Sequence, residues 1–326
     1  MTPRVSIVTP TYNRRDSLLR TLESLRRQTY PSNRFEIIVV DDGSDDGTQE
    51  ACSSLDDLPL TYVRQSHLGG TAAKNRGARE STGELLVFLD DDITVNAWFL
   101  KCLVKQHQEK AKAIVMGVLH DVAPDAARKQ PEADATMEGC DCAEVHFTEC
   151  LGGFFSIRRA DFMALGMLED PAPGYWPNWE DVDLAYRAES SGFTFYQCKQ
   201  AIGYHWDQVL SSLSTQCRRW EHAARSAVFL FQKHPALRTE IPMFRDKGPI
   251  EWRQDSPALV LRKVLRQIAS SDPVMWLMKQ PIPVLEHRAS DSTALRLLYR
   301  WIVSGHIYQG YRAGLREATW SESRLS

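Results

Sequence analysis

The chain has 326 residues, with 39 Lys and Arg against 42 Asp and Glu, so its formal charge is −3. This near-balanced surface lacks the basic excess that binding to a nucleic-acid backbone draws on, and 43% hydrophobic residues exclude a disordered chain. The composition is that of a globular protein, and the length predicts about two domains.

Two features bear on the compartment in which the protein works. No stretch reaches the roughly 18 apolar residues of a membrane span, and residues 1–4 lead straight into a strand pattern instead of a signal-peptide core. The seven cysteines are odd in number and scattered, which fits a reducing compartment better than a disulfide framework. We therefore expect a cytoplasmic protein. A metal knuckle of Cys140, Cys142, Cys150 and His146 is an alternative whose spacing matches no standard zinc pattern.

The first hundred residues alternate between strand and helix patterns. Short apolar runs typical of strands occur at residues 5–9, 36–40, 60–63 and 85–89. Helical spacing occurs at 17–28 and 71–80. Apolar strands joined by helical crossovers predict an open, mostly parallel α/β sheet covered on both faces. Ligands bind such sheets at the carboxyl ends of the strands, where polar clusters occur at residues 10–13, 41–44 and 90–92.

The alternation of strand and helix patterns stops in the middle of the chain. Residues 120–140 are charged and contain prolines, which predicts a mobile excursion from the sheet. An apolar turn is expected at residues 152–155, followed by an aromatic, proline-rich loop at 171–179. A helix is predicted over 180–190 and a strand over 194–204.

The last part of the chain is expected to be mainly helical. Helical patterns cover residues 211–231, 258–268 and 294–315, and loops that contain proline separate them. The sequence therefore predicts a helical extension after the sheet.

Asp90 and Asp92 follow the predicted strand at residues 85–89 and are two positions apart. In extended backbone their side chains point the same way, about 6.5 Å apart along the chain. Two carboxylates at that spacing can share Mg²⁺ or Mn²⁺ together with its polyphosphate ligand. The alternative is an acidic turn that caps the next helix.

Two other segments favour contact with a nucleotide. Asp42 could accept a hydrogen bond from a base or a ribose hydroxyl, and Gly43 leaves the backbone open to a flat ring. The alternative is a helix entrance with Ser44 or Asp45 as cap. A second segment places small and basic residues near a helix N-terminus, where an anion is favoured. These residues are Gly69, Gly70, Lys74 and Asn75, and they fit neither a Walker loop nor a dinucleotide turn.

The helix over residues 180–190 starts with acidic residues. The residues three, four and seven positions after Asp181 are Leu184, Ala185 and Ala188. Asp181 is therefore predicted to lie on the apolar, inward face, with Asp183 pointing about 200° away, toward solvent. The helix dipole and partial desolvation suit Asp181 to act as a general base. The alternative is an N-cap formed by Glu180 or Asp181.

Five ordered blocks together resemble family 2 glycosyltransferases of the GT-A fold. The blocks are residues 5–14 (VSIVTPTYNR), 39–48 (VVDDGSDDGT), 73–77 (AKNRG), 88–92 (FLDDD) and 180–184 (EDVDL). The resemblance covers about residues 4–206 and implies an inverting transfer of a sugar from a nucleotide diphosphate to an acceptor hydroxyl. It implies a GT-A domain over residues 1–210, with a nucleotide-binding half (1–115) and an acceptor half (140–210), followed by the helical extension 211–326.

The resemblance also assigns roles to residues. Those expected to contact the donor are Pro10, Thr11, Tyr12, Asn13, Asp42, Lys74, Asn75, Asp90 and Asp91, although the family often has arginine at the position of Lys74. Asp42 would contact the base and Asp90 the ribose. Asp92 and His205 would bind Mg²⁺ or Mn²⁺, and the alternative for His205 is a hydrogen-bonded core histidine. Asp181 would be the catalytic base, and Glu180 would help to hold the acceptor.

The resemblance leaves the substrates and partners open. The donor is expected to be linked to UDP, GDP or dTDP, and the acceptor to be a glycan, a lipid-linked sugar or a small molecule. A sugar nucleotidyltransferase is one alternative, but it would show a Gly-rich, basic segment after its first strand. A non-catalytic nucleotide-sugar binding module is another, and it would not need an inward Asp181.

Two aromatic segments have open interpretations. Tyr175, Trp176 and Trp179 could stack on an acceptor sugar or pack the loop that contains them. Residues 297–316 are aromatic, basic and amphipathic, so they are expected to pack against the catalytic domain or a second subunit. The alternative is peripheral attachment to the inner face of an anionic membrane.

Overall fold

The chain folds into two units in a computed structural model. It describes residues 3–122, 139–150, 153–174, 179–206, 212–288 and 292–325. Unit 1 comprises Met1–Glu169 and Glu180–Gln208, and unit 2 comprises Asp170–Trp179 and Val209–Ser326. Most of the predicted excursion at 120–140, together with Tyr175 and Trp176, lies outside the described residues.

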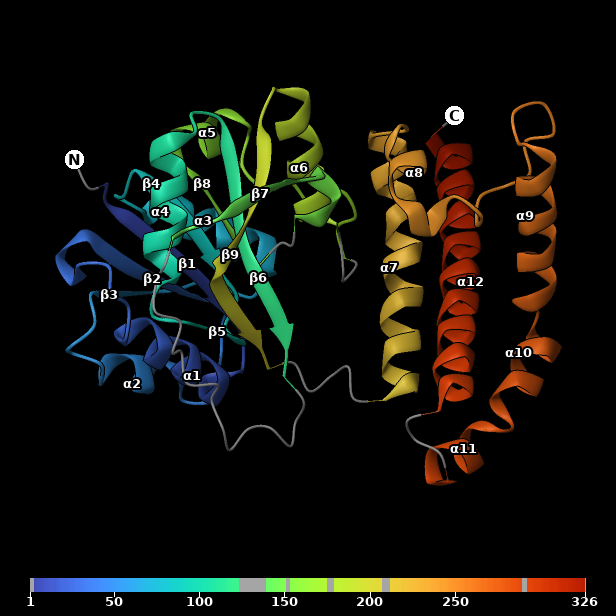
Figure 1. The fold of residues 1–326 in the computed structure, drawn as a ribbon, viewed down its shortest axis with the longest axis horizontal. Helices are drawn as coiled ribbons and strands as arrows, with labels where there is room; N and C mark the ends of the chain where they lie inside the picture. Colours follow the sequence, from blue (N-terminus) through green and yellow to red (C-terminus); the bar gives the residue numbers. More distant parts are fainter. Residues whose placement is uncertain are drawn as a thin grey trace. The chain divides into compact units, whose positions relative to one another are not determined.

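Parallel strands make up the first half of the sheet in unit 1. They are β1 (Val5–Thr11), β2 (Phe35–Asp41), β3 (Leu60–Arg64) and β4 (Leu85–Leu89), in the order β3-β2-β1-β4. The connecting helices are α1 (Arg15–Arg26), α2 (Thr48–Ser53) and α3 (Gly70–Glu80). Strands β1, β2 and β4 are buried almost throughout, as expected of strands covered on both faces. The predicted α/β sheet is confirmed (Figure 1).

The second half of the sheet is mixed. Its strands are β5 (Ile93–Val95), β6 (Ala113–Asp121), β7 (Cys142–Val145), β8 (Phe154–Arg158) and β9 (Thr194–His205). The order continues from β4 as β8-β6-β9-β5, with β7 also paired to β9. Helices α4 (Phe99–Glu109), α5 (Arg159–Ala164) and α6 (Glu180–Ser190) complete unit 1, with 3-10 turns at Ser32–Arg34 and Phe147–Glu149.

The turn expected at residues 152–155 is wrong, because Phe154 begins β8. This strand lies between β4 and β6 and is antiparallel to both. Successive side chains of a strand point to opposite faces, and both faces are covered here. Phe154 stacks on Phe99 at 5.1 Å, whereas Phe155 packs against Phe88 at 4.9 Å. The adjacent residues Phe154 and Phe155 therefore belong to a strand that is buried on both faces of the sheet.

An irregularity in β9 brings its end to β5. The register of β6 with β9 shifts between Gly117 and Val118, so residues 199–201 of β9 bulge from the ladder. The bulge packs on Gly117, where a Cβ would lie 2.2 Å from the carbonyl oxygen of Ala201. Beyond the bulge, β9 pairs with β5 and sets Ile93 opposite His205.

The cysteines correct the expectation of a chain without disulfides. Cys142 and Cys198 lie opposite each other on β7 and β9 and form a disulfide. Cys140 lies beside them, with its Sγ 3.1 Å from that of Cys102. The cysteines are scattered in sequence, but strand pairing brings them together, which spacing alone does not reveal. Among the described residues no group of three or more His, Cys, Asp or Glu side chains forms a metal cluster, so the knuckle is not formed.

Unit 2 is helical, as predicted. Its helices are α7 (Leu213–Lys233), α8 (Leu237–Glu240), α9 (Pro257–Ala269), α10 (Asp272–Lys279), α11 (Ile282–Arg288) and α12 (Thr293–Leu325), with a 3-10 turn at Pro242–Phe244. Helix α12 packs closely on α7, since a Cβ on Gly310 would lie 2.0 Å from the carbonyl oxygen of Glu221. None of the described helices has both the length and the apolar character needed to traverse a bilayer.

Candidate active site

The polar residues after β1 and β4 meet at the carboxyl end of the sheet. Thr11 ends β1, and its hydroxyl donates to Asp91 Oδ2 at 2.7 Å. Arg14 follows the same strand and contacts both carboxylates, with Nη1 3.3 Å from Asp91 and Nη2 2.8 Å from Asp92. The loop after β1 is thereby tied to the acidic triplet after β4. Arg14 has the most direct contacts with the triplet, and the sequence analysis gave it no role.

Adjacent carboxylates in the triplet differ in protonation. Burial raises the pKa of Asp91 to about 7, although Arg14 and the hydroxyl of Thr11 oppose the shift. Burial acts on Asp92 in the same direction, but a hydrogen bond from His205 and the charge of Arg14 outweigh it and hold the pKa of Asp92 below its usual value. At neutral pH the carboxylate of Asp92 is therefore more fully ionised than that of Asp91.

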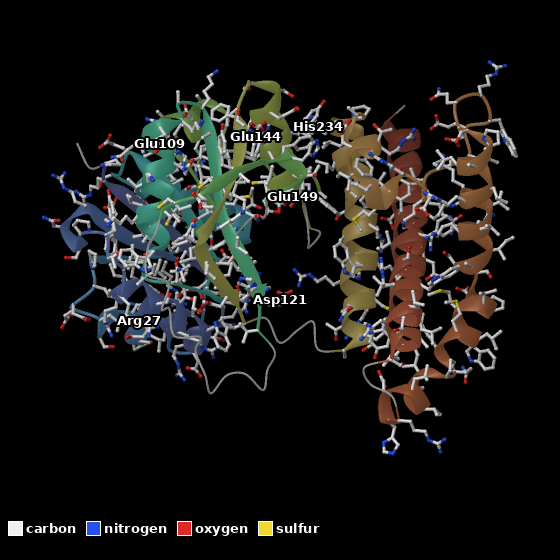
Figure 2. All side chains as sticks on the ribbon, in the orientation of Figure 1. Arg27, Glu109, Asp121, Glu144, Glu149 and His234 are labelled. Carbon is white, nitrogen blue, oxygen red and sulfur yellow. A yellow bond between two sulfur atoms is a disulfide. The ribbon has the colours of Figure 1, made fainter. Side chains whose placement is uncertain are left out.

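His205 is brought to Asp92 by the pairing of β5 with β9. Its Nε2 lies 3.5 Å from Asp92 Oδ2, and its Nδ1 lies 3.1 Å from Asp121 Oδ1. Asp121 ends β6 and is labelled there in Figure 2. Asp121 can therefore orient the imidazole so that Nε2 faces Asp92. Both residues predicted to bind a metal lie together, and His205 is not a core histidine buried on all sides.

The donor set of Asp92 and His205 fits a divalent cation. One carboxylate oxygen and one imidazole nitrogen lie within a few ångströms of each other, and both are ligand types of Mn²⁺. Arg14 Nη2 lies 2.8 Å from the same oxygen of Asp92, so a metal ion would share this carboxylate with the guanidinium or displace it. Two protein ligands leave room for substrate phosphates and water, which is how Mg²⁺ and Mn²⁺ sites are usually completed.

Lys74 connects the triplet to helix α6. Its Nζ lies 3.4 Å from Asp90 Oδ1 and 3.5 Å from Glu180 Oε1, and its side chain is only 7% exposed. Burial disfavours the charge of Lys74, but the combined attraction of Asp90, Glu180 and Asp181 outweighs it and raises the pKa of Lys74. The acidic residues from two distant parts of the chain therefore converge on one lysine.

The first residue of helix α6, Glu180, contacts Lys74. Burial raises the pKa of Glu180 to about 7, against the opposing charge of Lys74. Asp181 is half-buried, and one of its carboxylate oxygens accepts the backbone N–H of Val182 at 2.8 Å. Both residues named for acceptor chemistry thus lie at the first turn of the helix, where Lys74 connects Glu180 to Asp90 of the acidic triplet.

The orientation predicted for Asp183 is wrong. Asp183 is fully buried and lies 2.7 Å from Arg187, one turn along α6. The same guanidinium donates to the backbone carbonyls of Leu165 and Met167. Because this helix is covered on more than one side, a polar position opposite Asp181 is buried and takes its own counter-charge. The helical geometry gave the angle correctly but could not tell which directions face solvent.

Tyr12 and His67 form an aromatic platform after β1 and β3. Their rings stack at 4.1 Å, and Tyr12 is 43% exposed. The carboxylate of Asp42 lies below, accepting from the backbone N–H groups of Leu68 and Gly69 at 2.8 Å each. It also pairs with His67 Nδ1 at 2.8 Å. Asp42 thus organises the loop beneath the platform, and its predicted contact with a base stays a prediction.

The remaining predicted donor residues have structural partners. Pro10 is half-buried in β1, opposite Val40 of β2. Asn13 has a left-handed backbone (φ 51°), and its Oδ1 accepts the N–H of Asp45 at 2.9 Å. The amide of Asn75 is paired in both directions with the main chain of Leu168, at 2.7 and 3.0 Å. Their expected donor contacts stay predictions.

Gly153 was not singled out by the sequence analysis, although it contacts the site directly. Its carbonyl accepts the N–H of Asp90 at 2.9 Å, and a Cβ at this position would lie 1.8 Å from Asp90 Oδ2. The glycine therefore leaves the space that the Asp90 carboxylate occupies. The Gly152-Gly153 pair was the available signal, but it was interpreted as a turn.

Of the three aromatic residues in the loop before α6, only Trp179 is described. Its indole donates to the carbonyl of Ala223 at 2.7 Å, and its ring meets Phe244 edge-on at 5.8 Å. These contacts within unit 2 favour the packing interpretation for Trp179. The stacking predicted for Tyr175 and Trp176 falls outside the described residues.

Comparisons with known proteins point to one family. Residues 6–166 match the family model described as Glycosyl transferase family 2. Validoxylamine A glucosyltransferase from Streptomyces hygroscopicus subsp. jinggangensis is 28% identical over 277 residues, which cover 73% of this chain and 63% of that protein. Glycosyltransferase AglE from Haloferax volcanii is 26% identical over 210 residues, covering 62% and 67%. The chain thus spans less than two thirds of the first relative.

Solved structures share the fold. Mannosyltransferase PcManGT from Pyrobaculum calidifontis, in complex with GDP-Man and Mn²⁺, aligns with a TM-score of 0.62 at 19% identity, covering 96% of this chain and 88% of that one. S. aureus TarS 1-349 in complex with UDP-GlcNAc aligns with a TM-score of 0.52 at 18% identity, covering 95% and 92%. At these identities the alignments establish the fold alone. The family match and the shared fold identify residues 6–166 as a family 2 glycosyltransferase domain, in a chain with the GT-A fold.

Proposed function

We propose that the protein transfers a sugar from a nucleotide-diphosphate sugar to an acceptor hydroxyl with inversion, using a divalent cation and Asp181 as the general base. The single observation that carries the proposal is the position of Lys74 between Asp90 and Glu180. Because of this contact, the element that would bind the donor and the helix that would receive the acceptor share one site.

The donor would bind across the triplet and the aromatic platform. The exposed face of Tyr12 suits stacking on a base, and the half-exposed carboxylate of Asp90 suits acceptance of a ribose hydroxyl. Asp92 and His205 would hold Mn²⁺ or Mg²⁺. When bound, this cation supplies positive charge that stabilises the departing diphosphate. PcManGT binds GDP-Man and Mn²⁺, and TarS 1-349 binds UDP-GlcNAc, which supports a nucleotide-sugar donor here.

The acceptor would bind beside the first turn of α6. Asp181 would accept the proton of the acceptor hydroxyl as that oxygen attacks the anomeric carbon. A single base without a covalent nucleophile gives one in-line displacement, and therefore inversion. Glu180, whose pKa is raised to about 7 by burial, would hold the acceptor through a hydrogen bond. Lys74 would hold the carboxylates of Glu180 and Asp181 close to Asp90.

The donor is the first thing to test. A thermal-shift screen of UDP-, GDP- and dTDP-sugars with Mn²⁺ should identify one nucleotide that raises the melting temperature, because a ligand that binds only the folded state stabilises it. Adding EDTA should abolish the shift. If no nucleotide sugar stabilises the protein with either metal, the proposed donor class is wrong.

The base is tested by Asp181→Asn. We expect this variant to bind the donor as the unchanged protein does, while turnover measured by nucleotide release falls by about 10²–10⁴-fold. Glu189→Gln is the matched control, because it makes the same change of charge at an exposed position of the same helix. Product NMR should show the inverted anomer. Full turnover by Asp181→Asn would remove this residue from the mechanism.

A further inference from the structure

Exposed apolar side chains are concentrated in unit 2. Of the eleven large apolar residues exposed among the described residues, nine lie between positions 252 and 301. They are Trp252, Leu261, Leu265, Ile268, Trp276, Leu277, Val284, Leu297 and Trp301. Single exposed apolar residues need no explanation, but the members of this group that lie on the consecutive helices α9 and α10 mark an interaction surface.

Helix α9 carries the most ordered part of this group. Leu261, Leu265 and Ile268 are spaced four and three residues apart, which places them on one face of the helix, and each is more than half exposed. Trp276 and Leu277 on the next helix, α10, are also exposed. These five residues are called the α9 face below. Figure 1 shows α9 and α7 on different sides of α12 within this unit.

The opposite side of α9 is charged and paired. Lys263 is buried, and its Nζ contacts Asp255 at 2.6 Å and the carbonyl of Pro249 at 2.7 Å. Arg266 binds Asp246 at 3.1 Å and lies over the ring of Trp301 at 6.0 Å. Helix α9 therefore turns Lys263 and Arg266 toward the unit and its exposed leucines away from it. This is the reverse of an ordinary surface helix, whose apolar stripe faces the core.

The positive charge around the α9 face indicates which kind of partner it would bind. Residues 257–312 contain eight basic and three acidic side chains. Lys263 and Arg266 are paired with Asp255 and Asp246 outside this range, which leaves six basic side chains against three acidic ones. Arg262 lies beside Leu261 and is exposed, as are Arg296 and Arg300 beside Leu297 and Trp301. Two copies of such a surface would bring like charges together, but an anionic lipid headgroup region would attract them. Tryptophan and arginine around an apolar helix face are typical of helices that lie in the membrane interface.

We propose that the α9 face is a docking surface for an anionic lipid membrane, on which α9 lies in the plane of the interface. In this arrangement the helix lies on the membrane surface and does not cross it. The leucines insert below the headgroups and the flanking arginines contact lipid phosphates. The inference does not depend on the sugar-transfer chemistry, because it concerns unit 2 alone and its test measures binding to vesicles.

The test is co-sedimentation of the full chain with vesicles of phosphatidylcholine, with and without phosphatidylglycerol. We expect binding only to the anionic vesicles, and we expect added salt to weaken it. The double variant Leu261→Gln/Leu265→Gln should lose about tenfold in partitioning for each leucine. Arg262→Gln should lose about fivefold. Val284→Gln is the matched control, since it makes a similar change on α11, outside the α9 face.

Circular dichroism checks that the variants fold, which is expected because each changed side chain is exposed. Binding to anionic vesicles that the double variant loses and Val284→Gln keeps would support the proposal. Two results would overturn it. One is binding that is indifferent to lipid charge and to the leucines. The other is a dimer in sedimentation equilibrium that the double variant dissociates, without vesicle binding, which would make the partner a second copy.

Discussion

Replacing Lys74 by methionine tests whether the donor element and helix α6 share one site. Methionine retains much of the length of the side chain and removes its charge. Lys74 lies 3.4 Å from Asp90 and 3.5 Å from Glu180, and at such separations two unit charges interact by about 4–5 kcal/mol at an effective dielectric constant of about 20. The cost of burying the lysine offsets part of this. Removal of one partner from a buried pair typically costs about 3–5 kcal/mol, and that is the expected loss of stability.

The loss should depend on pH in a defined direction. In the intact protein the pKa of Glu180 is raised to about 7 by burial, against the charge of Lys74. Without the lysine the pKa of Glu180 should rise further, so the carboxyl stays protonated at about pH 6 and needs no counter-charge there. At about pH 8 the intact protein holds an ionised Glu180, whereas the variant must bury the charge unpaired or bind a proton. The difference in stability between the two proteins should therefore grow as pH rises.

Urea unfolding followed by far-UV circular dichroism at both pH values measures this difference. Lys74→Arg is the control, because it keeps the charge and has the side chain that the family often carries here; it should stay within about 1 kcal/mol of the unchanged protein. Donor binding by Lys74→Met should weaken along with stability. If Lys74→Met unfolds at the same urea concentration as the unchanged protein at both pH values, the bridge between Asp90 and Glu180 does not exist in solution.

Two further outcomes follow from single positions in unit 1. Gly153→Ala places a methyl group 1.8 Å from the carboxylate of Asp90, so the carboxylate must move; we expect about a 10²-fold loss of turnover with unchanged circular dichroism. Gly248→Ala, which meets no atom within 4 Å, is the control, and equal activity of the two variants would show that the Asp90 position is not critical. Burial, with a smaller contribution from Arg158, lowers the pKa of His107 to about 3. Because the unfolded chain binds the proton at about pH 6.5, stability is complete above that pH and falls by a few kcal/mol toward about pH 3. His107→Gln should flatten this dependence in urea titrations, and an unchanged pH profile would mean that His107 titrates normally.

The sequence predicted the parts of the fold that depend on local patterns. The apolar runs at 5–9, 36–40 and 85–89 each became a buried strand, because nearly continuous apolar residues suit a sheet covered on both faces. Strand β8 was missed because its first residues follow a glycine pair, and the reason for that glycine is a carboxylate far away in sequence. The pairing of β5 with β9 is equally non-local, and it alone brings His205 to the triplet.

The sequence singled out the acids of the candidate site together with Lys74 and His205, but not Arg14. Asp90, Asp92 and Asp181 could be singled out, since carboxylates after strands and at helix starts have recognisable positions. Arg14 had no such signal, because an arginine near a helix start is usually a solvated surface residue. Asp183 shows the opposite error: a helical angle gives direction, but only the packed structure tells whether that direction meets solvent or another part of the protein.

The acidic triplet explains why those bases are needed. Three consecutive carboxylates at the end of a buried strand repel one another, and without compensation they would bind protons instead of a cation. Two bases supply the counter-charge: Lys74 lies beside Asp90, and Arg14 is shared by Asp91 and Asp92. The lysine comes from α3 and the arginine from the end of β1, so the elements that position the bases also fix the distances between the acids. The triplet is therefore preorganised by charge before any substrate arrives, and a cation that binds Asp92 joins an electrostatic arrangement that the fold has already built.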